Sequence, residues 1–163
     1  MIAEKYCQHY YRLYGLKTNI LRYFNVYGPK KRGNAVDVFI RNALAQNPLK
    51  INGDGTQFRD FVHVSDVVRV TISCFLSDQY GEIYNVGTGI ATKVIDLAER
   101  IIQATNTSSK ILFESPRPGD IKGITADINK IQRELSFIPQ YSIEKGLLET
   151  LRFYTEESAS PIL

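Results

Sequence analysis

The sequence predicts an α/β fold, in which helices alternate with the strands of a parallel sheet and short β segments form a smaller second lobe. The strongest indication is residues 18–25 (TNILRYFN), because their nearly continuous apolar character is typical of a strand buried on both faces of such a sheet. Segments with helical apolar spacing alternate with further β-rich runs, and Gly and Pro separate them. With 163 residues, 44% of them hydrophobic and 23% charged, the chain can bury one ordinary core.

The first quarter of the chain predicts two helices around this strand. Apolar side chains recur at helical spacing over residues 2–14, and Gly15 follows as a helix-ending residue. The strand at residues 18–25 leads into a Gly- and Pro-containing loop at residues 26–33. Helical spacing returns over residues 36–46 and stops before an Asn-Pro pair.

The next segment predicts a compact β unit followed by a helix. A short strand at residues 49–51 runs into the Gly-Asp-Gly turn at residues 53–55, and a second short strand is expected at residues 61–64. Ser65 is a suitable N-cap for a helix over residues 66–76.

The second half continues the alternation of strand and helix. Residues 82–86 (EIYNV) predict a strand, and Thr92 is expected to cap a helix whose apolar residues lie between positions 94 and 102. Residues 110–113 predict another strand. The remaining expected elements are a loop and two helices, at residues 116–119, 127–135 and 142–155.

Composition excludes several classes of function. The net charge of +3 comes from 20 basic and 17 acidic residues spread along the chain, so no nucleic-acid partner is expected. Cys7 and Cys74 lie far apart without metal-ligand spacing, which predicts neither a metal site nor a disulfide scaffold and favours a cytoplasmic location. No apolar run approaches the roughly 20 residues that span a bilayer, so no membrane association is expected.

Five stretches, in this order and spacing, resemble the extended short-chain dehydrogenase/reductase family, and within it the NAD-dependent nucleotide-sugar epimerases and dehydratases, most of all UDP-hexose 4-epimerases. They are AEKYCQHYYRLYGL from Ala3, LRYFNVYGP from Leu21, PLKINGDGTQFRDFVHVSDV from Pro48, YNVGTG from Tyr84, and RPGDI with ADINK between Arg117 and Lys130. The resemblance implies the C-terminal part of a Rossmann-type parallel sheet domain plus the smaller α/β substrate-binding lobe. Residues 1–35 would belong to the former, and residues 36–163 mainly to the latter, with some segments returning to the sheet.

The resemblance also implies what these residues do not contain. The family's catalytic Tyr-x-x-x-Lys pair would fall just before Met1, so no catalytic residue is expected in this chain. NAD is the expected cofactor, but no G-x-G-x-x-G or G-x-x-G-x-x-G run is present to hold its pyrophosphate. A homodimer is expected for the full-length protein, because the family's helix corresponding to residues 2–14 continues into a dimer-forming bundle.

The remaining motifs match the family's nucleotide-sugar site. Arg59 and Arg117 resemble its two phosphate-contacting arginines, and planar bidentate donors suit a diphosphate better than lysine does. Asp120 resembles the acidic residue that receives a ribose hydroxyl. Asn25 matches an asparagine that reaches the diphosphate from the end of a strand.

Five further positions are expected near the ligands on the strength of the resemblance alone. Val36 matches a position beside the nucleotide, and the backbone between Leu49 and Ile51 matches a segment that contacts the base edge. Tyr23 and Phe24 resemble residues near the nicotinamide ring.

Plain structural interpretations stand beside these assignments. Arg59 followed by an aspartate is usually a solvated ion pair, and Asn25 could satisfy backbone groups at a strand end. His63 alternates with two valines, which predicts a hydrogen-bonded structural histidine. The tyrosines near the N-terminus, at helical spacing, indicate core or interface.

The leading hypothesis is the nucleotide-sugar-binding part of a UDP-hexose 4-epimerase. A dehydratase of the same family, a non-catalytic nucleotide-sugar-binding fragment and a non-functional gene remnant are the alternatives.

Overall fold

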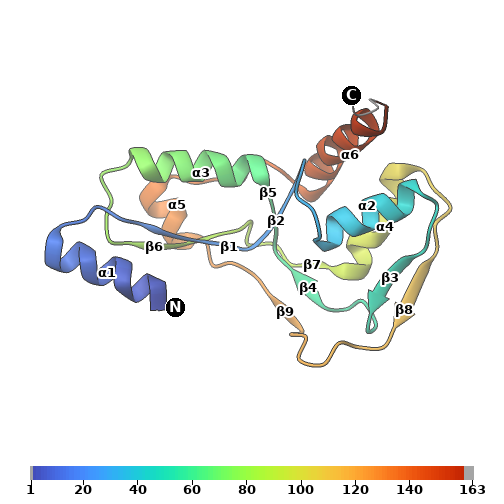
Figure 1. The fold of residues 1–163 in the computed structure, drawn as a ribbon, viewed down its shortest axis with the longest axis horizontal. Helices are drawn as coiled ribbons and strands as arrows, with labels where there is room; N and C mark the ends of the chain where they lie inside the picture. Colours follow the sequence, from blue (N-terminus) through green and yellow to red (C-terminus); the bar gives the residue numbers. More distant parts are fainter. Residues whose placement is uncertain (1, 160–163) are drawn as a thin grey trace.

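The computed structural model describes residues 2–159, with the side chains of residues 2–156, and has mixed α/β architecture (Figure 1). Its elements in chain order are α1 (Ile2–Tyr14), β1 (Ile20–Tyr23), β2 (Asn25–Tyr27), α2 (Ala35–Leu44), β3 (Leu49–Asn52), β4 (Phe58–Arg59), β5 (Phe61–His63), α3 (Val64–Leu76), β6 (Ile83–Val86), β7 (Thr92–Lys93), α4 (Val94–Thr105), β8 (Ile111–Glu114), β9 (Gly123–Ile124), α5 (Asn129–Leu135) and α6 (Ile143–Ala159). The α/β prediction is confirmed, and each predicted helix is present.

The strand predicted at residues 18–25 is divided at Phe24, where the chain changes its pairing partner. β1 pairs in parallel with β6, and β2 pairs in parallel with β5. The Phe24 N–H donates to the Val86 carbonyl, and the next N–H, that of Asn25, donates to the Asp60 carbonyl. Residues 20–27 therefore lie against two different segments in succession.

Two apolar cores lie on either side of this change of partner. The larger core lies between α2, α4, α6 and β3 and includes the buried residues Phe39, Ile40, Leu49, Ile101 and Leu147. The smaller core lies between α3, α5 and β6 and includes Val70, Tyr84, Val86, Ile131 and Phe137.

The prediction that the strand at residues 18–25 is buried on both faces is wrong within the described part of the chain. β1 has only partly buried and exposed residues, and the Tyr23 side chain is 45% exposed. β6 is the one strand that pairs with β1 among residues 2–159, and α1, which lies on the opposite side of this pair from α3 (Figure 1), contains no buried residue.

Two helix caps also differ from the prediction. The N-cap of α3 is His63 rather than Ser65, and its Nδ1 accepts the Ser65 N–H at 3.3 Å. Thr92 belongs to β7, opposite Arg59, and does not cap α4. The Val94 N–H instead donates to the Gln57 carbonyl, so backbone groups that follow the Gly-Asp-Gly turn satisfy the start of this helix.

Two further short sheets are present among the described residues. β3 pairs in parallel with β8, and β4 lies between β7 and β9, where Phe58 faces Gly123 and Arg59 faces Ile124. The strands β7 and β9, of two residues each, were not predicted. They place the loop that follows β8 beside the cavity described below.

Candidate functional site

A cavity of about 660 Å³ lies where β2, α2, β3 and β4 meet the loop after β8. Segments more than 90 residues apart in the chain contribute to it. Six of the residues predicted from the sequence line it together: Phe24, Asn25, Ile51, Arg59, Arg117 and Asp120.

Arg59 is the most firmly held of the cavity's cations. Its side chain is 18% exposed, and Nη2 donates one hydrogen to Asp120 Oδ1 at 2.6 Å. Nη1 donates to the carbonyls of Phe58 and Ile121, at 2.8 and 3.1 Å. A guanidinium has five N–H donors, so Nε and the second Nη2 hydrogen are left for a ligand. The ordinary interpretation, a solvated pair with the adjacent Asp60, is wrong, because the partner of Arg59 is Asp120.

Asp60 points away from Arg59 and is fully buried. Its carboxylate accepts four hydrogen bonds: Thr88 N–H and Oγ1 reach Oδ1 at 2.8 and 2.7 Å, and the N–H groups of Gly89 and Ala126 reach Oδ2 at 2.9 and 3.0 Å. A Cβ added to Gly87 would lie 2.5 Å from Oδ2, which explains the glycine there. The sequence interpretation missed Asp60, because its hydrogen-bond donors lie 28 to 66 residues away in the sequence.

Asn25 lies at the start of β2 and contacts the same residue from the cavity side. Its backbone N–H and its side-chain Nδ2 both donate to the Asp60 carbonyl, at 3.0 and 3.3 Å. Asn25 therefore satisfies a strand end, as the structural interpretation expected, while it also lines the cavity.

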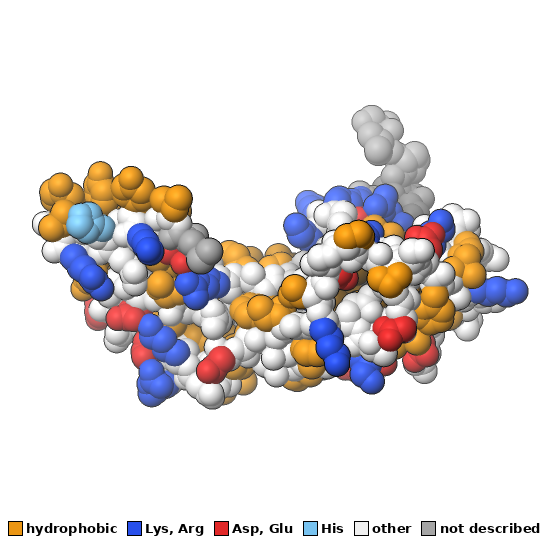
Figure 2. Space-filling view, turned by 90° about the horizontal axis from the view of Figure 1, so that it is seen from below, with side chains coloured by type: hydrophobic (Ala, Val, Ile, Leu, Met, Phe, Trp, Pro, Cys, Tyr) orange, Lys and Arg blue, Asp and Glu red, His pale blue; other side chains and the backbone are white. Residues whose placement is uncertain are grey.

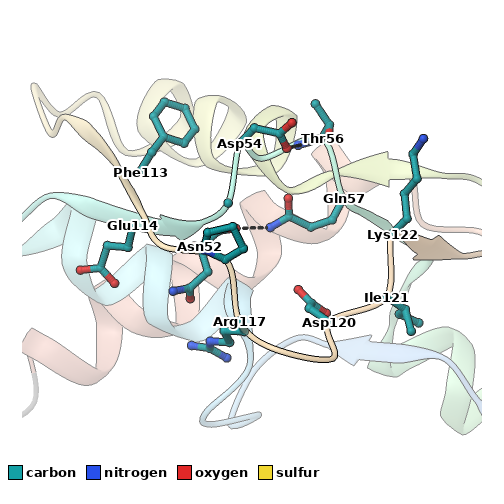
Figure 3. A pocket seen from close by; sticks show the side chains of 12 residues that line it. Asn52, Asp54, Thr56, Gln57, Phe113, Glu114, Arg117, Asp120, Ile121 and Lys122 are labelled. Atoms are coloured by element: carbon teal, nitrogen blue, oxygen red, sulfur yellow. Dashed lines mark hydrogen bonds between the residues drawn. The ribbon is translucent and has the colours of Figure 1, made fainter.

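Arg117 and Asp120 are close because the chain turns between them. The Asp120 N–H donates to the Arg117 carbonyl at 3.2 Å, and Gly119 has a φ of +76° in this turn. Figure 3 shows both side chains on this loop, beside a second cavity of about 660 Å³ that Phe113 and Asp54 also line. Arg117 and Asp120 line both cavities, so the two adjoin.

Three predicted residues do not line the cavity. Val36 and Leu49 are buried in the larger core, on α2 and β3. Tyr23 is directed to α3, where its hydroxyl lies 2.9 Å from Thr71 Oγ1. The neighbouring β3 residues Lys50 and Ile51 do line the cavity, so it borders the strand rather than the Leu49 side chain.

The charge of the cavity lining is positive. Four cationic residues, Lys31, Lys50, Arg59 and Arg117, face one carboxylate, Asp120. The first residue of α2 and its N-cap, Asn34, also border the cavity, and the N-terminal end of a helix favours anions.

The buried carboxylate of Asp37 holds the start of α2, which borders the cavity, in place. Burial alone would raise the pKa of Asp37, but hydrogen bonds from Tyr154, the Gly33 N–H and Arg41 outweigh it, and the pKa is lowered. The Gly33 N–H and Arg41 lie 2.6 and 2.7 Å from Oδ2. Asp37 therefore stays ionised and ties the preceding loop to α2.

Comparison with known proteins agrees with this architecture. Residues 1–87 match the model of the NAD dependent epimerase/dehydratase family. The chain belongs to this family. It is 37% identical over 156 residues to UDP-N-acetyl-alpha-D-glucosaminuronate decarboxylase from Bacillus cytotoxicus, covering 90% of this chain and 49% of that protein. It is 36% identical to UDP-glucuronate 4-epimerase from Thermodesulfobacterium geofontis, covering 94% and 48%.

Solved structures of the family superpose closely on the chain. UDP-glucose 4-epimerase from Thermotoga maritima, solved with UDP-glucose, is 32% identical with a TM-score of 0.91, covering 96% of this chain and 52% of that one. The dTDP-glucose 4,6-dehydratase DesIV from Streptomyces venezuelae, solved with NAD and TYD bound, is 30% identical with a TM-score of 0.88, covering 96% and 49%. The chain thus spans about half the length of the relatives it matches.

NAD is the family's cofactor, and the described residues do not fit its pyrophosphate. That group is held by the N–H groups of a glycine-rich turn at a helix start. The two closely spaced glycine pairs, Gly53–Gly55 and Gly87–Gly89, lack a third glycine at the required spacing. One member of each pair is also crowded: a Cβ on Gly55 would lie 2.9 Å from the Ile95 side chain, and one on Gly87 would lie 2.5 Å from Asp60 Oδ2. Phe24, expected near the nicotinamide ring, does line the cavity.

Two further features were not found in residues 2–159. No helix in that range is long and apolar enough to cross a bilayer. No three side chains of His, Cys, Asp or Glu gather there in a way that could hold a metal ion.

Proposed function

We propose that this chain binds the nucleoside diphosphate of a nucleotide-sugar, as the substrate-binding part of an NAD-dependent epimerase of the UDP-hexose 4-epimerase type. One observation carries the proposal. Asn25, Arg59, Arg117 and Asp120, from three distant segments, line one cavity in which the charged residues are mainly cationic.

The geometry suggests a role for each group. Arg59 keeps two N–H donors that can reach a phosphate oxygen, and Arg117 adds a second guanidinium from the opposite loop. Asp120 can accept a ribose hydroxyl while it remains paired with Arg59 on one oxygen. The base would lie near Ile51 and the backbone of β3, and Phe24 would face the nicotinamide side.

Assembly and location are also proposals. Figure 2 shows a ridge of hydrophobic side chains over α1, whose large exposed apolar residues are Ile2, Tyr6, Tyr10, Leu13 and Tyr14. This face supports a homodimer. Both cysteines are free thiols, which supports a reducing, cytoplasmic location. The division into residues 1–35 and 36–163 stays a proposal as well.

A dehydratase or decarboxylase of nucleotide-sugars is the second candidate. It is favoured by relatives with those names, including the Bacillus cytotoxicus decarboxylase. The side chains proposed to bind the diphosphate suit both candidates equally. Product analysis with a longer protein that contains this sequence would distinguish the two candidates.

The binding proposal is tested by calorimetric titration of the chain with UDP and with uridine. We expect UDP to bind and uridine to bind far more weakly, because the cavity's cations contact the diphosphate. Arg152, an exposed arginine on α6 that does not line the cavity, provides the control Arg152→Ala, which should bind UDP as the natural chain does. Absence of UDP binding, or equal binding of uridine, would refute the proposal.

A further inference from the structure

Arg59 and Asp60 are adjacent residues whose side chains hold the same distant segment from opposite sides. Arg59 bonds Asp120 and the Ile121 carbonyl, and Asp60 bonds the Ala126 N–H. Residues 120–126 are therefore fixed at both ends by one dipeptide.

The middle of this segment is fixed by the backbone of β4. Phe58 faces Gly123, Arg59 faces Ile124, and the Phe58 N–H donates to the Lys122 carbonyl at 3.0 Å. The segment directly follows the turn that begins at Arg117, and Figure 3 shows Arg117, Asp120, Ile121 and Lys122 along the continuous loop. A displacement at Ala126 would thus be transmitted to the two side chains that line the cavity.

We infer that Asp60 is a positioning residue for the diphosphate site: its buried carboxylate sets the place of the loop that carries Arg117 and Asp120. This inference rests on the proposed function. Asp60 itself does not line the cavity and would not contact the ligand.

The contacts require a carboxylate rather than an amide. Both oxygens of Asp60 receive two donors each, and all four donors are N–H or O–H groups. An asparagine has one oxygen and one NH₂ group in place of the two carboxylate oxygens. In either orientation of the amide, the NH₂ group would therefore face two hydrogen-bond donors instead of acceptors. Gly87 packs closely against this side chain, because a Cβ there would lie 2.5 Å from Asp60 Oδ2 and 3.0 Å from Asp60 Cγ.

Asp66 provides a matched control in the same molecule. It is also fully buried, and it accepts hydrogen bonds from Arg69 and from the N–H groups of Gln140 and Tyr141. Its contacts join α3 to the segment before α6, and it lines neither cavity at the proposed site. Asp66→Asn should lower the melting temperature without changing the affinity for UDP.

The experiment measures melting temperature and UDP affinity for Asp60→Asn and Asp66→Asn. We expect Asp60→Asn to weaken UDP binding by about tenfold or more, the range associated with a lost hydrogen bond to a charged group. Asp66→Asn should change UDP affinity by less than about twofold, within the variation expected for an unconnected site. Trypsin cleavage after Lys122 should accelerate in Asp60→Asn and not in Asp66→Asn.

A double-mutant cycle separates positioning from general loss of stability. If Asp60 acts through the loop, removal of Arg117 should cost less affinity in the Asp60→Asn background than in the natural chain. Full additivity, or an unchanged UDP affinity in folded Asp60→Asn, would overturn the inference. If Asp60→Asn does not fold, Thr88→Ala removes one of the four donors and should still weaken UDP binding, whereas unchanged affinity would count against Asp60.

Failure of the proposed function would look different. In that case the natural chain itself would not bind UDP, and the inference would fall with it. If the natural chain binds UDP and Arg117→Ala weakens that binding, a null result for Asp60→Asn refutes only the positioning role.

Discussion

The region of α1 and β1 and the region around the cavity differ in how fully their apolar surfaces are covered. α1 has no buried residue, and β1 keeps an exposed Tyr23. In α4, by contrast, Leu97, Ala98 and Ile101 are completely buried against the larger core. The described contacts thus bury a core in the second region and bury no residue of α1 in the first.

This difference follows the division of chemistry between the two regions. The residues proposed for the diphosphate, Arg59, Arg117 and Asp120, lie in the region that contains the larger buried core. Phe24, proposed for the nicotinamide side, directly follows β1 at the edge of the less covered region. The comparison predicts that nucleotide binding and cofactor binding behave separately in this chain.

The largest expected effect concerns the cofactor. We expect the isolated chain to retain no NAD and to interconvert no UDP-glucose and UDP-galactose, because its sequence has no G-x-G-x-x-G or G-x-x-G-x-x-G run to hold a pyrophosphate. The measurement is mass spectrometry of the denatured protein for released NAD, with a turnover assay. A stoichiometric NAD signal would contradict the prediction that this chain binds a nucleotide without the cofactor, and it would require another cofactor site in these residues.

The second expected effect concerns the two arginines. Removal of either Arg59 or Arg117 should cost about 1.5–3 kcal/mol of UDP binding, the typical contribution of a hydrogen bond to a charged group. That is on the order of 10- to 100-fold in affinity. Arg59→Ala should also lower the melting temperature, because Arg59 bonds two backbone carbonyls and Asp120, whereas Arg117→Ala should not.

Calorimetric titration with UDP and a thermal melt of each variant distinguish these contributions. The Arg152→Ala variant again serves as the control. Unchanged UDP affinity in both Arg59→Ala and Arg117→Ala would show that the diphosphate lies elsewhere.

The sequence was sufficient for the helices and for six of the residues that line the cavity. Helical apolar spacing depends on local residues alone, so the helices at residues 2–14 and 66–76 lie close to their predicted bounds. The cavity residues came from motifs of the family, and Arg59, Arg117 and Asp120 do line one cavity.

Features set by distant contacts were not predicted. The strand break at Phe24 exists because the hydrogen-bonding partner changes there from β6 to the carbonyl of Asp60, a residue far along the chain. Asp60 was interpreted as the neighbour of Arg59, since nothing local indicates that its partners are Thr88, Gly89 and Ala126. The prediction that Thr92 caps α4 was wrong because backbone carbonyls of residues 53–57 accept the first N–H groups of this helix, and only the fold brings these carbonyls near it.

A smaller effect is expected for Asp120→Asn. If Asp120 accepts a ribose hydroxyl, this change should weaken UDP binding by about three- to tenfold, the range of a net hydrogen bond. Loss of the carboxylate also removes a negative charge beside the diphosphate and leaves Arg59 without its partner. Pyrophosphate, which has no ribose, should therefore bind as well as before or better.

The ratio of UDP to pyrophosphate affinity measures this directly. A fall in that ratio supports the ribose assignment, while an equal fall for both ligands points to a displaced loop. A fall in melting temperature that matches the loss of binding would mark Asp120 as structural. The small change in stability expected otherwise follows from its place in a partly exposed loop.

The smallest expected effect concerns the junction of the two cores, where His63 is fully buried. Burial lowers the pKa of His63, and nearby Glu149 and Asp66 oppose this only in part, while Lys145 adds to it. The ring stacks on Tyr141 at 4.2 Å, lies 5.3 Å from Tyr27, and accepts the Ser65 N–H through Nδ1. The folded protein therefore keeps His63 neutral at pH values where the unfolded chain protonates it.

The sign of the pH dependence follows from proton binding. Between the lowered folded pKa and the ordinary value of 6.5, the unfolded chain binds more protons, so the free energy of unfolding decreases as pH falls. The slope from one such group is at most about 1.4 kcal/mol per pH unit. His63→Asn keeps a cap acceptor for Ser65 but cannot titrate. Urea denaturation from about pH 7.5 to about pH 5 should show a steeper loss of stability in the natural chain than in His63→Asn, and parallel profiles would show that the pKa of His63 does not differ between the folded and unfolded states.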